Sequence, residues 1–92
     1  MTQLYVMLTV DLDKGVTTQQ RTTFNEQLAE GLWVKLNLTT TWYAKFVEGA
    51  TVEGAIQATK NIVAKAAAAA RIAAYEAAAE VGWDKPVVWN TL

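Results

Sequence analysis

The fold predicted for this chain depends most on the segment VAKAAAAARIAAYEAAAEVGW, residues 63–83. Alanine fills most of its positions, and neither glycine nor proline interrupts it before Gly82. Alanine is the strongest helix former because its side chain loses no conformational entropy in a helix. With Thr51 as the N-cap and Glu53 in the first turn, the pattern predicts one helix of roughly 30 residues, about 45 Å long, that ends near Gly82.

The surface of this predicted helix consists mostly of methyl groups. Its larger apolar residues Ile72 and Tyr75 lie three positions apart on one stripe. A stripe of small residues lets a second helix approach closely, so it indicates contact with a second copy of the chain or with another protein. The alternative is that alanine is tolerated where the helix crosses its own sheet or meets solvent.

The segment before this helix predicts a strand and a shorter helix. Residues 4–12, LYVMLTVDL, place apolar side chains at every second position, which is the period of a β-strand. Thr17 and Gln20 have the spacing of a capping box, and Gly31 stands where a helix ends. The pattern therefore predicts a helix over residues 18–30, with two inward-facing residues one turn apart, Phe24 and Leu28.

Residues 32–47, LWVKLNLTTTWYAKFV, predict an antiparallel hairpin because two runs of strand-forming residues flank a polar step at residues 37–40. Residues 85–90, KPVVWN, predict a short final strand. The chain of 92 residues is therefore expected to be a single α+β domain over residues 1–92, with a ferredoxin-like βαββαβ order and an extended alanine-rich second helix. The hairpin residues expected to face the core are Leu32, Val34, Leu36, Leu38, Trp42, Ala44 and Phe46.

The sheet face turned away from the helices is predicted to be aromatic and basic, whereas an open antiparallel face is normally polar. Such a face indicates a dimer or another protein partner. The alternative is single-stranded RNA, whose bases stack on aromatic side chains while lysines meet phosphate. The residues expected on this face are Tyr5, Met7, Trp33, Lys35, Tyr43, Lys45 and either Val88 or Trp89.

The composition excludes several kinds of chemistry. The sequence has no cysteine, histidine or serine, so it offers no thiolate or serine nucleophile, no histidine base and no Cys/His metal site. The formal net charge of −1 gives no general attraction to nucleic acid or to an anionic membrane. No cofactor and no metal are expected.

Residues 1–15 are interpreted as a strand and turn, not as a signal peptide. Charged residues recur through the alanine segment, so no membrane span is expected. Together these features indicate a cytoplasmic protein.

The first half of the chain, residues 4–47, resembles the small ferredoxin-like proteins related to the CRISPR adaptation nuclease subunit and the type V antitoxin endoribonucleases. The resemblance lies in LYVMLTVDLDKG, residues 4–15, and LNLTTTWYAKF, residues 36–46. It implies that Asp11 is a metal-binding carboxylate paired with its copy across a dimer axis. The alternative is that Asp11, which stands before a turn, is an ordinary turn-forming residue.

The sequence therefore predicts a small, non-catalytic binding or regulatory protein, such as an inhibitor of a larger bacterial or phage-targeted machine. It is expected to form a homodimer and to contact another protein. The binding residues expected from these patterns are those of the aromatic face together with Ile72 and Tyr75. The alternative is a metal-dependent endoribonuclease, or an RNA-binding antitoxin-like protein, that uses Asp11 and the aromatic face.

Overall fold

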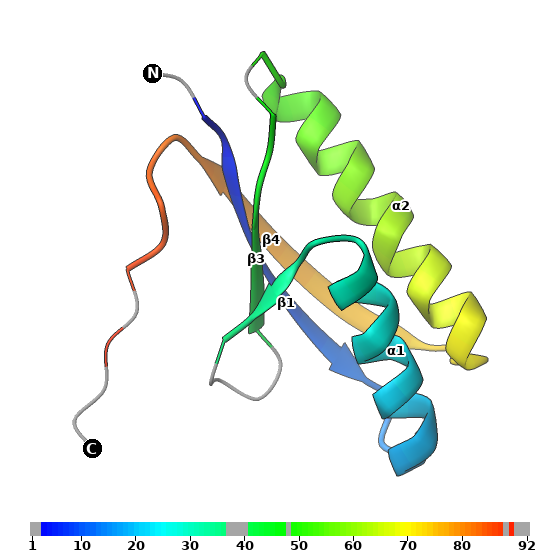
Figure 1. Cartoon of the computed structure of the whole chain (residues 1–92). Helices are drawn as coiled ribbons and strands as arrows, with labels where there is room; N and C mark the ends of the chain where they lie inside the picture. Colours follow the sequence, from blue (N-terminus) through cyan, green and yellow to red (C-terminus); the bar gives the residue numbers. More distant parts are fainter. Residues whose placement is uncertain (1–2, 37–40, 48, 88, 90–92) are drawn as a thin grey trace.

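The computed structural model describes residues 3–36, 41–47, 49–87 and 89. These residues form an α+β structure in which two helices lie on one face of a four-stranded antiparallel sheet (Figure 1). The elements in chain order are β1 Tyr5–Leu12, α1 Thr18–Glu30, β2 Val34–Lys35, β3 Thr41–Lys45, α2 Val52–Ala70 and β4 Tyr75–Gly82.

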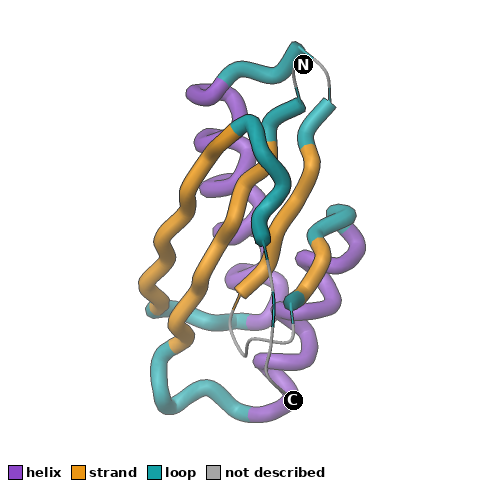
Figure 2. The backbone as a smooth tube through the Cα atoms, turned by 90° about the vertical axis from the view of Figure 1, so that its left-hand side faces the viewer, coloured by secondary structure: helices purple, strands orange, loops and turns teal. Residues whose placement is uncertain are grey.

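The strands are ordered β2-β3-β1-β4, so β1 is central and β4 forms an outer edge (Figure 2). β1 pairs with a different strand on each side: Leu8 lies opposite Trp42 of β3 and opposite Ala79 of β4. All eight residues of β4 pair with β1 in one continuous register, from Tyr75 opposite Leu12 to Gly82 opposite Tyr5. The edge strand is therefore regular along its whole length.

The core lies between the sheet and the two helices. Alternate residues of the first strand are buried, as the period of two predicts, and the inward-facing residues of the first helix are buried as well. Full burial of each such apolar side chain stabilises the fold by about 1.5–3 kcal/mol relative to exposure. The largest of these buried side chains are Phe24, Leu4, Leu8, Leu28 and Val6.

The first helix begins and ends where the sequence predicts. Thr17 Oγ1 accepts a hydrogen bond from the Gln20 amide at 3.1 Å, and Gln20 Oε1 accepts one from the Thr17 amide at 2.9 Å, which completes the capping box. Gly31 follows the last helical residue. A Cβ atom at Gly31 would lie 3.2 Å from Cδ1 of Ile62, so the missing side chain lets the two helices approach closely.

The prediction of one long alanine helix is wrong. α2 begins as expected, with Thr51 Oγ1 accepting a hydrogen bond from the Gly54 amide at 2.9 Å, but it ends at Ala70 after 19 residues. The second half of the alanine segment, residues 75–82, is the edge strand β4. The fourth strand of the sheet thus comes from the segment assigned to helix.

A left-handed residue ends α2. Arg71 has φ 60° and ψ 40°, and its amide donates to the carbonyl of Ala68 at 3.1 Å. The next amide, that of Ile72, donates to the carbonyl of Ala67 at 2.8 Å. These two bonds form a Schellman motif, which stops a helix by satisfying its last carbonyl groups. Ile72 is buried, so core packing fixes the turn although no glycine stands there.

A second Schellman motif ends α1, and it reverses the predicted assignment of which residues around β2 face the core. Leu32 has φ 71°, its amide donates to the carbonyl of Ala29, and the Trp33 amide donates to the carbonyl of Leu28. As a result Trp33 is buried, although it was predicted on the open face. Its ring packs edge-on against the ring of Phe46, with 6.3 Å between the two ring centroids.

The hairpin alternation predicted for the core is therefore correct for β3 and wrong for β2. Trp42 and Ala44 are buried. Leu32 and Val34 are exposed, at 84% and 47% of their maximum areas, because the left-handed turn shifts the alternation by one residue. Leu36 is half-buried, Phe46 is partly buried against the core, and Leu38 lies outside the described residues.

The final strand predicted over residues 85–90 is not observed at its described positions, residues 85–87 and 89, which are irregular. Val87 and Trp89 are both 78% exposed, so neither packs as an inward-facing strand residue would. The last strand of the observed sheet is instead β4, which lies beside β1. Among the described residues, neither helix has the length and apolar character needed to cross a membrane.

Candidate functional site

The open face of the sheet brings together four of the residues predicted there. Tyr5 lies opposite Lys45, and Met7 lies opposite Tyr43, so the four side chains share one face of β1 and β3. Lys35 lies opposite Trp42, whose side chain is buried, and therefore belongs to the other face. The left-handed turn before β2 moves both Trp33 and Lys35 away from the predicted aromatic surface.

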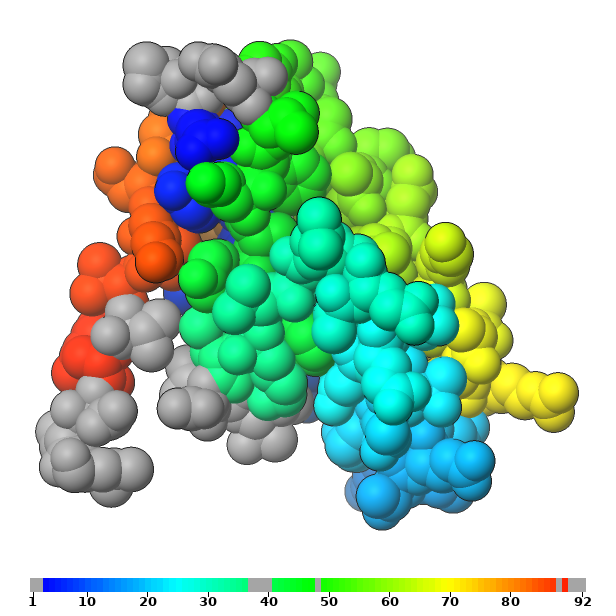
Figure 3. All heavy atoms as spheres, viewed as in Figure 1, coloured from blue at the N-terminus to red at the C-terminus, as the bar shows by residue number. Residues whose placement is uncertain are grey.

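The segment after β4 passes over this open face. Figures 2 and 3 show it on the side of the sheet opposite the helices. The Lys85 ammonium lies 5.8 Å from the centroid of the Tyr43 ring, within the range of a cation–π contact. An RNA base that stacked on Tyr43 would have to displace Lys85, so RNA binding at this face stays a prediction. Trp89, also predicted there, is exposed and outside the sheet, and Val88 lies outside the described residues.

Asp11 lies on the exposed side of β1, directly opposite Glu76 of β4. Together with Asp13, these residues line a shallow hollow at the end of the β1–β4 ladder. In the described ranges no group of three or more His, Cys, Asp and Glu side chains is arranged to hold a metal ion. The role of Asp11 in metal binding stays a prediction.

The two residues predicted on a helix-packing stripe have different surroundings. Ile72 is buried at the end of α2, so it belongs to the core and does not form a binding surface. Tyr75 is the first residue of β4 and is 37% exposed. The stripe itself does not exist, because a strand replaces the second half of the predicted helix.

The longest run of exposed strand residues in the described structure lies in β4, which the sequence interpretation missed. Residues 75–80 are all exposed, although they are paired with β1 along one side. Natural proteins block sheet edges with proline, with lysine or other charged side chains, and with bulges. β4 has no proline, lysine or bulge, and its charged residues are Glu76 and Glu80. A signal was present: Tyr75, Ala77, Ala79 and Val81 alternate with Glu76 and Glu80, as in a strand with one polar face.

The hydrogen-bond pattern of the sheet shows which backbone groups of β4 face outward. Opposite residues in an antiparallel ladder alternate between bonded and non-bonded pairs. The Asp13 amide donates to the carbonyl of Ala74, just beyond β4, which makes 13 and 74 a bonded pair. The next bonded pairs then involve residues 76, 78, 80 and 82. The backbone amide and carbonyl groups directed away from β1 belong to Tyr75, Ala77, Ala79 and Val81.

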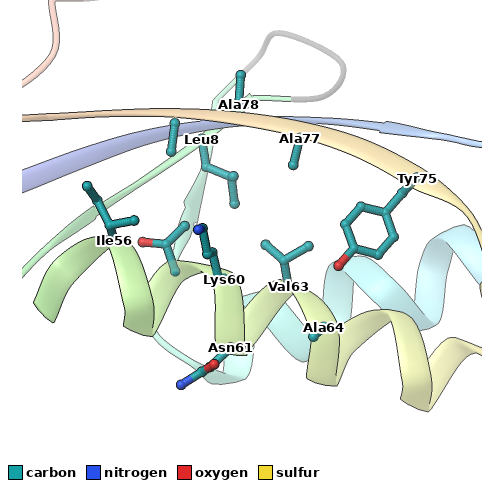
Figure 4. A pocket seen from close by; sticks show the side chains of 11 residues that line it. Leu8, Ile56, Lys60, Asn61, Val63, Ala64, Tyr75, Ala77 and Ala78 are labelled. Carbon is teal, nitrogen blue, oxygen red and sulfur yellow. The ribbon is translucent and has the colours of Figure 1, made fainter. Parts of the chain in front are cut away.

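A groove separates β4 from α2 on the helix side of the sheet (Figure 4). Its volume is about 520 Å³, and its lining is mainly apolar. Ala77 points toward α2 and Ala78 points away from it, which agrees with the alternation of the strand. The α2 wall includes Ile56, which is 38% exposed, and Lys60. Three of the residues with outward-facing backbone groups, Tyr75, Ala77 and Ala79, thus also line this groove.

The chain matches no protein-family model, no curated protein and no solved structure. Its function is therefore inferred from the chemistry of its own surfaces. The β4 edge combines unpaired backbone groups with an adjacent apolar groove, and these two features together can hold an extended polypeptide.

Proposed function

We propose that this chain is a small, non-catalytic regulatory protein that binds another polypeptide by adding a strand to the β4 edge. The observation that carries the proposal is the eight-residue edge strand, which is regular, exposed over residues 75–80 and contains no proline, lysine or bulge. An added strand would form main-chain hydrogen bonds with the outward-facing groups, and its alternate side chains would enter the groove beside α2.

Inhibition of a larger bacterial or phage-targeted machine is the regulatory role that the sequence suggests. The geometry of β4 supports a mechanism for this inhibition. A segment of the target protein would bind to β4 as an extended strand and could then no longer make the contacts that the target needs. Strand addition needs no reactive side chain, which agrees with a sequence that lacks cysteine, histidine and serine.

The order of the elements, strand-helix-strand-strand-helix-strand, supports placing the fold among the ferredoxin-like proteins. In this arrangement the last strand lies beside the first, and here it forms one outer edge of the sheet. The binding strand is then joined to α2 by the Schellman turn at Arg71, so the strand and the groove wall are held by the same short connection.

A neutral probe peptide tests the proposal. The peptide Thr-Val-Gln-Val-Thr-Val-Gln-Val, with blocked ends and a fluorescent label, should bind the wild-type chain in an anisotropy titration. Ala79→Pro removes one outward-facing amide, and proline is tolerated at such edge positions. Because a partner carbonyl then loses its donor, binding should weaken by roughly 10-fold.

Ala79→Ser is the matched control, because it keeps the amide and nearly the same side-chain volume. Circular dichroism should show that both variants are folded. Wild-type chain that fails to bind the peptide, or binding that is equal in the proline and serine variants, contradicts strand addition at this edge.

Self-association stays a prediction from the sequence. Sedimentation measurements on the same variants would show which surface of the chain forms the dimer. A dimer that is lost in Ala79→Pro would make a second copy the occupant of the edge. A dimer that is unchanged in this variant would place self-association on another surface.

A further inference from the structure

The β4 edge carries a row of negative charge on one face. Glu76 and Glu80 are exposed and four positions apart, so both project from the open face of the sheet. Asp11 lies opposite Glu76 on the same face and adds a third carboxylate to this region. A strand added to this edge would place its own side chains directly opposite the two glutamates, where unlike charges stabilise pairing and like charges oppose it.

This charge pattern disfavours a second copy of β4 as the added strand. Two copies paired about a two-fold axis through Ala78 would place Glu76 of each copy opposite Glu80 of the other. If the axis passes through Ala77 or Ala79, two identical glutamates become diagonal neighbours, about 7–8 Å apart. Every register that overlaps most of the strand therefore brings carboxylates of the two copies together.

On the side of the edge that faces the helices, an added strand should carry apolar rather than basic side chains. The side chains of Tyr75, Ala77 and Ala79 face the groove, which is mainly apolar and has room for aliphatic groups. Lys60 stands on the α2 wall of the same groove. A lysine or arginine on this side of an added strand would be placed near Lys60 and would lose part of its hydration.

We propose, building on the function inferred above, that the polypeptide bound at β4 has two basic residues four positions apart and aliphatic residues at the alternate positions. The basic side chains lie opposite Glu76 and Glu80, and the aliphatic side chains enter the groove between β4 and α2. The two faces of the edge thus select the partner by complementary means, charge on the open face and apolar shape on the helix side.

Three labelled peptides that differ at two positions test this partner chemistry. The basic probe is Thr-Val-Lys-Val-Thr-Val-Lys-Val, whose lysines lie opposite Glu80 and Glu76 in an antiparallel register. The neutral and acidic probes carry glutamine or glutamate in place of both lysines. For two cross-strand pairs, the basic peptide should bind wild-type chain roughly 2- to 30-fold more tightly than the neutral one. The acidic peptide should bind most weakly.

Charge reversal of the edge supplies the reciprocal test. In the double variant Glu76→Lys with Glu80→Lys, the order of the peptides should invert, so that the acidic peptide binds best. Raising the salt concentration from about 0.05 M to about 0.5 M should reduce the difference between basic and neutral peptides, because exposed charges are screened. The neutral peptide should bind both proteins with similar affinity.

The outcomes separate this inference from the function on which it rests. If basic and neutral peptides bind equally to wild-type chain, and Ala79→Pro weakens both, the edge adds strands without charge selection and the partner inference is wrong. If no peptide binds at all, strand addition itself is wrong. Preference for the basic peptide that persists in the double variant would also overturn the inference, because the two glutamates would then not be its cause.

Discussion

The side-chain amide of Gln20 donates a hydrogen bond to the backbone carbonyl oxygen of Arg71 at 3.0 Å and so joins the start of α1 to the end of α2. The same side chain uses its oxygen to cap α1 by accepting from the Thr17 amide. Gln20 therefore serves two helix ends, although Gln20 and Arg71 lie 51 positions apart in the chain.

Gln20→Ala removes both interactions and should lower the free energy of unfolding by about 1–2 kcal/mol, measured by urea denaturation. Gln20→Glu is the matched control, since it keeps an oxygen acceptor for the Thr17 amide and loses the donor to Arg71. Gln20→Glu should lower the free energy of unfolding by about half as much as Gln20→Ala does. An alanine variant as stable as the wild type would show that neither bond contributes.

Arg71→Gly should stabilise the chain by about 0.5–1 kcal/mol. The left-handed region is unfavourable for residues with a Cβ atom and open to glycine, and this gain exceeds the greater entropy that glycine has in the unfolded state. Arg71→Ala keeps the Cβ atom and should remain close to wild type. Thermal unfolding compares the three, and a glycine variant that melts below the alanine variant would contradict the expectation.

The buried and exposed alanines of α2 should respond differently to the same change. Ala66 is fully buried in the core, whereas Ala69 is exposed on the same helix. Ala66→Leu should therefore destabilise the fold by about 1–3 kcal/mol through overpacking. Ala69→Leu should change stability by less than about 0.5 kcal/mol. Equal effects in denaturant unfolding would mean that alanine is not required by packing.

Glu80→Lys should promote dimerisation through β4. With Ala78 on the two-fold axis, the introduced lysine faces Glu76 of the other copy, and two repulsive pairs become two attractive ones. The dimer dissociation constant should fall by roughly 10-fold relative to wild type. Sedimentation equilibrium measures it, with Glu80→Gln expected in between. No change in mass distribution between wild type and the lysine variant would argue against pairing at this edge.

Asp11→Asn should raise the free energy of unfolding by about 0.2–1 kcal/mol, because it removes a like-charge pair with Glu76. We expect the melting temperature of both proteins to be insensitive to Mg²⁺. Thermal melts with and without the ion check this, since a ligand that binds the folded state raises its stability. A wild-type melt that rises with Mg²⁺ while that of the variant does not would favour the endoribonuclease alternative.

The parts of the fold that the sequence predicts correctly are those in which local preference and tertiary structure agree. β1 has strand-forming residues at a period of two, and Thr17 with Gln20 marks the start of α1. β3 is predicted by the same alternation, with Trp42 and Ala44 buried as expected. In these segments the short-range pattern is sufficient.

The errors occur where long-range contacts determine the conformation. Leu32 and Arg71 are left-handed without being glycine, and each precedes a large residue that the core buries, Trp33 or Ile72. Residues 75–82 favour a helix by composition, but they supply the strand that β1 needs at its free edge. The candidate site was missed for this reason, since it consists of that strand.

The alanine segment also has a consequence for the kinetics of folding. Residues 63–80 favour helix locally, so the unfolded chain should hold residual helix across the position where Arg71 later turns. That helix must melt beyond Ala70 before β4 can pair with β1. Folding of this chain therefore includes a step in which non-native helix is first lost, and substitutions that strengthen helix within residues 75–80 should slow the reaction even where they leave the folded surface unchanged.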